Sequence, residues 1–153
     1  MVLADQCTKE IVASRLPLNS GMEVIPGYFN LVHVRNPGAA FGIMADSQSR
    51  FRPVFLLLVS AAALIIILWT VTVSGDVGWL VLAACGLFFG GAVGNLVDRV
   101  RFGEVMDFLD FHAGALHWPA FNVADSALCV GTGLLFIHFI LGKKRAGQPG
   151  PGP

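Results

Sequence analysis

The residues best suited to chemistry are carboxylates that stand inside or beside apolar segments. Asp125 is the clearest, because it lies near the start of residues 121–141, a run with no other formal charge. A charge at the centre of a membrane-spanning helix costs about 2.5–3.5 kcal/mol, while a helix N-terminus recovers only about 0.3–1 kcal/mol. The cost is smaller near the membrane edge, but the carboxylate still needs a partner. We therefore predict that Asp125 is functional and that Asn122, one turn earlier, caps this helix.

A second acidic position lies on a stripe of small residues. Gly86, Gly90 and Gly94 recur every four residues, and Asp98 continues the same helical face. Small residues at this spacing let another helix approach closely, so Asp98 is expected to face a neighbouring helix. The last apolar run is expected to repeat the pattern with Asp125, Cys129 and Gly133.

Further polar residues lie at the same ends of the apolar runs. Asp5 and Lys9 are one helical turn apart, which predicts a neutralised pair that tolerates membrane depth. Asn95 and Arg99 flank the face that carries Asp98. The simplest structural interpretation of Asp98 and Arg99 is an ion pair at a helix end.

Two carboxylates held close together would allow aspartic-protease chemistry, because one keeps a proton while the other activates a water molecule. Asp107 and Asp110 are the candidates for the second acid, and both follow Gly103 in an extended stretch. Spacing alone does not distinguish them. No metal-binding helix motif appears, and no metal or other cofactor is expected.

The composition places these residues in a membrane. Hydrophobic residues make up 55% of the 153-residue chain and charged residues only 13%, against about 25% charged in a typical soluble domain. Residues 54–73, 79–97 and 121–141 are apolar runs of spanning length, and residues 74–78 are expected to form a tight hairpin. Ten basic and ten acidic residues cancel, so no global charge indicates nucleic-acid binding.

Charged residues predict the orientation of these spans. The basic cluster at residues 143–145 follows the last span and should be cytoplasmic. Residues 13–52 and 98–120 are then extracytoplasmic. Four arginines fall on that outer side against the positive-inside trend, namely Arg50, Arg52, Arg99 and Arg101.

The outer segment is expected to form a small β-element. Residues 28–34 are aromatic and β-branched, which predicts a strand, and residues 36–38 are typical of a turn. Residues 39–44 are apolar and are expected at the membrane interface. Residues 1–12 are too short to span and are interpreted as the outer end of a helix whose first half is absent. A single membrane domain is expected over residues 1–142, with a tail at residues 143–153, basic and then Gly/Pro-rich, that is disordered.

Five blocks of sequence resemble lipoprotein signal peptidase, also called signal peptidase II, of bacteria. They read DQCTK at 5–9, NPGAAF at 36–41, GGAVGNLVDR at 90–99, VMDF at 105–108 and FNVADS at 121–126. Each block alone is weak, but five in family order over nearly the whole chain are specific. The resemblance implies an all-α membrane protein, a bundle of four transmembrane helices with the first truncated here, carrying a small extracytoplasmic β-cradle and an interfacial segment.

The resemblance also implies an activity. The chain would be an aspartic endopeptidase of the bacterial inner membrane, with its active site at the extracytoplasmic face and its C-terminus in the cytoplasm. It would remove the signal peptide of a diacylglyceryl-modified prolipoprotein, cutting just before the lipidated cysteine. The partners implied are this substrate and membrane lipid, and the inhibitor globomycin is expected to bind the site.

The family pattern assigns roles that spacing leaves undecided. It selects Asp107 over Asp110 and pairs it with Asp125 as the catalytic residues. Substrate-binding or dyad-supporting roles are implied for Asn36, Asn95, Asp98, Arg99, Asn122, Asp5 and Lys9.

Three other functions stay open at this point. A metal-dependent protease could use His112 and His117 between the two aspartates, although their spacing is unspecific. A carrier or proton pathway also places carboxylates in a membrane, but here the acids gather at one face, and His138 stands alone in the last span. A non-catalytic lipoprotein-binding protein on the same scaffold is disfavoured because both aspartates are present.

Overall fold

A computed structural model describes residues 1–38, 52–73 and 78–146. Within these ranges the chain forms four helices and a four-stranded sheet. The helices are α1 (Val2–Arg15), α2 (Arg52–Val73), α3 (Trp79–Phe102) and α4 (Val123–Ala146). The strands are β1 (Ser20–Ile25), β2 (Phe29–Asn36), β3 (Val105–Ala113) and β4 (Leu116–His117).

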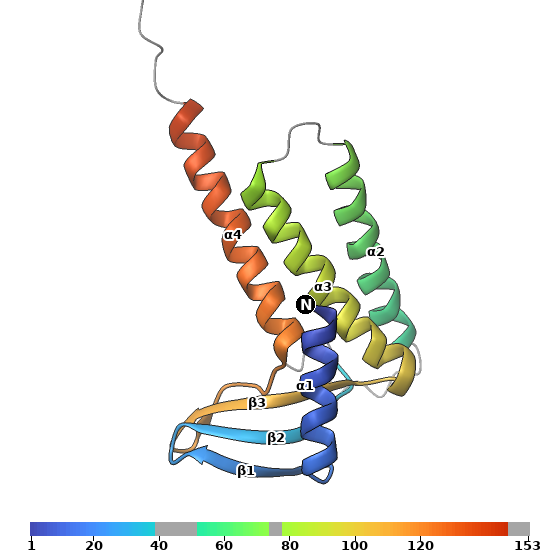
Figure 1. The fold of residues 1–153 in the computed structure, drawn as a ribbon, viewed down its shortest axis with the longest axis vertical. Coiled ribbons are helices and arrows are strands. Elements are labelled where there is room, and N and C mark those ends of the chain that lie inside the picture. The colour runs from blue at the N-terminus through green and yellow to red at the C-terminus, as the bar shows by residue number, and fades with distance from the viewer. Residues whose placement is uncertain (39–51, 74–77, 147–153) are drawn as a thin grey trace, which may run out of the picture.

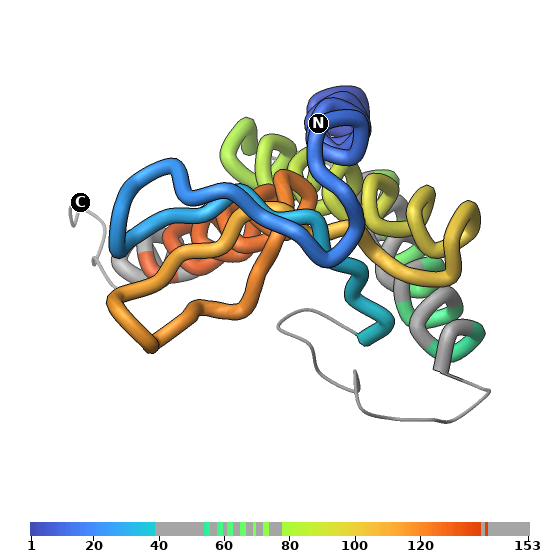
Figure 2. The backbone as a smooth tube through the Cα atoms, turned by 90° about the horizontal axis from the view of Figure 1, so that it is seen from below, coloured from blue at the N-terminus to red at the C-terminus, as the bar shows by residue number. Residues whose placement is uncertain are grey.

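The helices rise from a sheet that lies across one of their ends (Figure 1). Helix α3 packs against both α2 and α4, and the shorter α1 packs against α3, α4 and the sheet. Seen from below, the sheet lies across the start of α4, with α1 and the end of α3 beside it (Figure 2). Side chains of α1, α3, α4 and the sheet can therefore meet at the end of the helices where the sheet lies.

The sheet is antiparallel, with strand order β1-β2-β3-β4. Val34 faces Asp107 across the β2–β3 ladder, and Leu109 forms a bridge with Phe121 just before α4. Successive residues of a strand point to opposite faces. Met106 and Phe108 accordingly pack with Val12 of α1 in a small core, while Asp107 between them points the other way.

The described helices agree with the three apolar runs, and the helix expected within residues 1–12 is confirmed as α1. Among these residues, α3 is long and apolar enough to cross a membrane, and α4 carries a shorter apolar helix at Val123–His138. Large apolar side chains also stand exposed on the helices, with Leu58 62% and Phe136 66% accessible. Such surface is costly in water but compatible with lipid.

Several predictions about local structure can be compared with the described residues. The strand predicted at 28–34 is confirmed as β2, whereas β1 and β4 were not predicted. Residues 143–146, predicted to belong to a disordered tail, continue helix α4. The predicted hairpin (at 74–77), the interfacial segment at 39–44 and the end of the tail (147–153) lie outside the described residues.

The prediction of a second packed stripe on the last helix is wrong. Cys129 is exposed, and a Cβ added at Gly133 would meet no described atom within 4 Å. Close packing instead uses Gly131, where an added Cβ would lie 3.1 Å from the Ala84 carbonyl oxygen of α3. The face that holds Asp125 is therefore left open along α4.

Candidate active site

The start of α4 is built by a reciprocal pair of hydrogen bonds between Asn122 and Asp125. The side-chain oxygen of Asn122 accepts from the backbone N–H of Asp125 at 2.9 Å. The Oδ2 atom of Asp125 accepts in return from the backbone N–H of Asn122 at 3.3 Å. This is a capping box, in which two otherwise unpaired backbone donors are satisfied. It confirms the predicted cap and holds the Asp125 carboxylate at the helix end.

Asp107 comes from β3 and is only 1% exposed. Its Oδ1 accepts from Asn122 Nδ2 at 2.7 Å, and its Oδ2 accepts from Asn36 Nδ2 at 3.0 Å. The pKa of Asp107 is raised from 3.8 to about 7, first by burial and then by the nearby charge of Asp125. The two amide donors and the ammonium of Lys9 act in the opposite direction without cancelling the rise.

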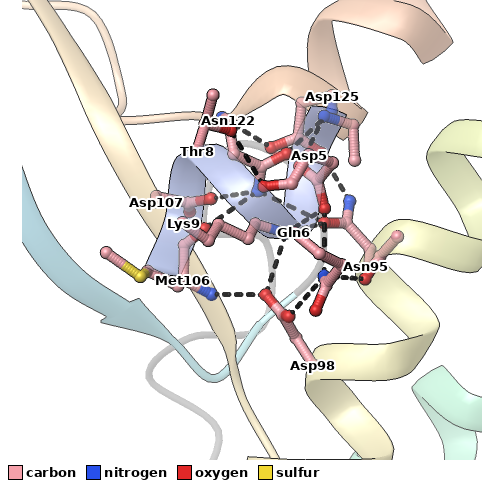
Figure 3. A network of polar contacts seen from close by, with 12 residues as sticks. Asp5, Gln6, Thr8, Lys9, Asn95, Asp98, Met106, Asp107, Asn122 and Asp125 are labelled. Carbon is pink, nitrogen blue, oxygen red and sulfur yellow. Dashed lines mark hydrogen bonds and ion pairs between the residues drawn. The ribbon is translucent and has the colours of Figure 1, made fainter. Parts of the chain in front are cut away.

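Asn122 thus connects two acids that are 18 residues apart in the chain. Its side-chain nitrogen binds Asp107, while its side-chain oxygen and backbone fix Asp125. Asn95 of α3 holds the second acid from the other side, donating from Nδ2 to Asp125 Oδ1 at 2.8 Å. Strand β3 and helices α3 and α4 therefore converge on one pair of carboxylates (Figure 3).

A buried ion cluster lies behind this pair. Lys9 of α1 is 4% exposed, and its ammonium lies 2.8 Å from both Asp5 Oδ2 and Asp98 Oδ2. It also donates to Asn95 Oδ1 at 3.2 Å. The predicted Asp5–Lys9 pair is confirmed, but the predicted Asp98–Arg99 ion pair is wrong. Asp98 pairs with Lys9 because α1 packs on the glycine face of α3.

The close approach of α1 to α3 depends on a missing side chain. A Cβ at Gly94 would lie 2.7 Å from Asp5 Oδ2, closer than such atoms come. Gly90 likewise faces α1, at Met1, whereas an added Cβ at Gly86 meets nothing within 4 Å. The glycine stripe therefore serves its predicted role along two of its three positions.

One polar contributor to the cluster was not singled out from the sequence. Gln6 donates to Asp98 Oδ1 at 2.9 Å and to the Gly94 carbonyl at 3.1 Å. Its position beside Asp5 carried no signal of its own, because i and i+1 residues point to different sides of a helix. Only the packing of α1 against α3 brings it to Asp98.

Neither Arg99 nor Asp110 is hydrogen-bonded to the two carboxylates, although the charge of Arg99 interacts with the charges of Asp125, Asp107 and Asp98. Arg99 donates from Nη2 to the Gly38 carbonyl at 3.2 Å, which ties α3 to the turn after β2. Asp110 accepts from Asn30 at 2.9 Å and lies 2.9 Å from His117 Nδ1. Burial would raise the pKa of Asp110, but the hydrogen bonds from His117 and Asn30 outweigh it and lower the pKa. Asp107, and not Asp110, shares partners with Asp125.

Comparisons with known proteins place the chain in a family. The sequence profile described as signal peptidase II matches residues 1–141. The chain belongs to the signal peptidase II family. Lipoprotein signal peptidase of Desulforapulum autotrophicum is 46% identical over 143 residues, which cover 94% of this chain and 88% of that protein. The enzyme of the same name from Geobacter sulfurreducens is 46% identical over 144 residues, 94% and 89% of the two chains.

Solved structures of bacterial membrane enzymes share the fold. One, determined by the in meso method at 2.3 Å, superposes with a TM-score of 0.83 at 33% identity, covering 99% of this chain and 88% of that one. Another, at 1.9 Å, gives a TM-score of 0.78 at 35% identity, with 90% and 86% covered. The chain is accordingly a membrane protease of the signal peptidase II family, whose members cleave signal peptides from prolipoproteins.

An apolar cavity in this signal peptidase II opens beside Asp125. Its volume is about 490 Å³, and it runs along the open face of α4. It is lined by Trp118, Phe121, Asp125, Ser126, Leu128, Cys129, Val130 and Thr132. An apolar groove that ends at a carboxylate suits a ligand with a lipid-like body and a polar reacting end.

The described residues offer no alternative metal centre. No group of three or more His, Cys, Asp or Glu side chains is placed to hold a metal ion within ranges 1–38, 52–73 and 78–146. His112 and His117 stack on one another at a centroid distance of 4.7 Å, and Asp110 lies 2.9 Å from His117 Nδ1. The two histidines therefore form a pair with Asp110 near the β3–β4 end of the sheet.

Proposed function

We propose that Asp107 and Asp125 are the catalytic dyad with which this signal peptidase II cleaves prolipoproteins. The observation that carries the proposal is the shared contact with Asn122, which binds one acid through its side chain and caps the other. The acids come from elements that meet only in the folded protein, and both are held by amide donors. Geometry of this kind is typical of a site that two carboxylates share.

The chemistry follows from the electrostatics of the pair. Close carboxylates do not readily both ionise, so the dyad titrates as one unit that holds a single proton. The ionised partner takes a proton from a water molecule, which attacks the scissile carbonyl carbon. The protonated carboxyl donates to the developing oxyanion. Collapse of the tetrahedral intermediate breaks the C–N bond as a proton passes to the leaving amine.

The surrounding residues have supporting roles in this proposal. Asn95, Asn36 and Asn122 fix the two carboxylates through their amide groups. Asp5, Lys9 and Asp98 hold α1 against α3 and place the Lys9 ammonium, paired with two carboxylates, behind the dyad. Arg99 positions the turn after β2 through its bond to Gly38.

The substrate in this proposal is a diacylglyceryl-modified prolipoprotein, cut just before the lipidated cysteine. The apolar groove along α4 would receive the lipid-embedded part of the substrate from the side, with the scissile bond at Asp125. Globomycin, as a family inhibitor, would occupy the same groove. Because the groove opens on the lipid-facing surface, the substrate need not leave the bilayer to reach the acids.

The topology proposed here has four transmembrane helices in one domain spanning residues 1–142. The dyad and sheet lie at the extracytoplasmic face of the bacterial inner membrane, and the tail from residue 143 is cytoplasmic. The basic residues at the end of α4 support this orientation by the positive-inside rule. Cysteine accessibility to impermeant reagents at the two ends of α4 tests it directly.

The dyad is tested with a diacylglyceryl-modified precursor and purified protein in lipid. Asp107→Asn and Asp125→Asn are each expected to abolish cleavage while the helical content is retained. Asp110→Asn is the matched control, since this acid lies on the same strand but contacts Asn30 and His117, and it should still cleave. Cleavage by either dyad variant would refute the proposal, and loss of activity in a chelator would favour a metal-dependent reaction.

A further inference from the structure

Two arginines share one aromatic ring at the outer end of α3. The guanidinium carbon of Arg35, on β2, lies 4.3 Å from the ring centre of Phe102, and that of Arg101 lies 4.8 Å from it. We call these three residues the arginine cluster. Cation–π contacts of this kind hold each guanidinium in place, at about 0.5–1 kcal/mol where exposed. Each of the two positive charges is thereby held against the same neutral side chain.

No carboxylate balances these charges within the described residues. The ion pairs of this part of the chain involve Lys9 and His117, and neither arginine. The Nη1 atom of Arg35 is buried and has no hydrogen-bond partner there. A buried donor without an acceptor costs about 1–3 kcal/mol, more when it is charged. In the described part of the chain the arginine cluster therefore has no carboxylate that neutralises it, whereas Lys9 is paired with Asp5 and Asp98.

The depth of the cluster indicates where such an anion would come from. Trp79, 77% exposed, begins α3, and tryptophan is enriched where a membrane meets water. From Trp79 to Arg101 the helix rises about 33 Å at 1.5 Å per residue. The hydrocarbon core of a bilayer is about 30 Å thick, so Arg101 and Phe102 reach the headgroup layer of the opposite leaflet.

We propose that the arginine cluster binds the phosphate of an anionic phospholipid in the outer leaflet. Guanidinium groups match phosphate oxygens with two parallel N–H donors each. A headgroup with net negative charge neutralises two unpaired cations better than a zwitterionic one, which brings its own positive charge. The proposal also explains why Arg101 stands on the outer side against the positive-inside trend, and it does not depend on the catalytic dyad.

The test measures lipid preference in the purified full-length protein. The protein is equilibrated in mixed micelles with equal amounts of palmitoyl-oleoyl phosphatidylglycerol and phosphatidylcholine, and native mass spectrometry counts the lipids retained. The wild type should retain phosphatidylglycerol preferentially. The preference should fall roughly fivefold in Arg101→Gln, where the side chain is exposed, and roughly thirtyfold in Arg35→Gln/Arg101→Gln.

Arg15→Gln is the matched control, because Arg15 is also an exposed arginine at the outer end of a helix. It should leave the preference unchanged. An equal preference in the wild type and the double variant would overturn the proposal. So would displacement of the lipid by inorganic phosphate, beyond the effect of chloride at equal ionic strength, since that would identify a site for free phosphate.

Discussion

Replacing Asp107 with asparagine should change how the stability of the protein depends on pH. The pKa of Asp107 is about 7 in the folded protein, against a usual value of 3.8. The folded state therefore holds this proton more tightly than the unfolded state. The stability it contributes is fully present below the lower value and is lost as pH rises through the upper one.

The size of this effect follows from the difference between the two pKa values. About 3 units at 1.36 kcal/mol each correspond to about 4 kcal/mol. Asp107→Asn cannot ionise, so the free energy of unfolding of the wild type should fall by about 4 kcal/mol relative to the variant between pH 4 and 8. Asparagine also leaves one of the donors Asn36 or Asn122 without an acceptor, a cost of about 1–3 kcal/mol that does not vary with pH.

Both the pH-dependent and the pH-independent effect can be measured by unfolding the protein with sodium dodecyl sulfate in mixed micelles. Tryptophan fluorescence follows the unfolding at several pH values. The cost of the unpaired donor should lower the free energy of unfolding of Asp107→Asn by the same amount at every pH. The ionisation of Asp107 should lower that of the wild type by an amount that grows toward alkaline pH. Asp110→Asn is a control in which the dependence of stability on pH should have the opposite sign. The pKa of Asp110 is lowered by His117 and Asn30, so its charge stabilises the folded state. Parallel curves for the wild type and Asp107→Asn would show that burial does not perturb Asp107 as argued.

Two further substitutions test the surroundings of the dyad. Gly94→Ala should destabilise the protein by about 1–3 kcal/mol, because the new Cβ would lie 2.7 Å from a buried carboxylate oxygen of α1. Thermal unfolding should show no such loss for Gly86→Ala, where the space is open. Asn36→Ala removes a donor that lowers the pKa of Asp107, so the alkaline limb of the pH–activity profile should move upward by about 1–2 units. Asn30→Ala, on the same strand, should leave the alkaline limb of the profile unchanged. An equal shift in both variants would show that the hydrogen bond from Asn36 is not what lowers the pKa of Asp107.

The features of the site that sequence predicted are those that depend on local spacing. Asn122 and Asp125 are three residues apart, so their capping box is decided within one helical turn. Asp5 and Lys9 are likewise one turn apart. The glycine stripe placed Asp98 on a packed face, because helical periodicity alone determines which residues share a side. Family membership was also readable, since its motifs are short and lie in order along the chain.

The features that sequence left undecided depend on how distant segments pack. Asp107 and Asp110 look equivalent in an extended stretch, and only the antiparallel register of β2 and β3 gives them different partners. The expected Asp98–Arg99 pair failed because a lysine of α1 reaches Asp98 instead. Side chains three residues apart on a strand point to opposite faces. Tertiary packing therefore decided which acid joins Asp125, while the sequence by itself determined that Asp125 stands at the capped start of an apolar helix.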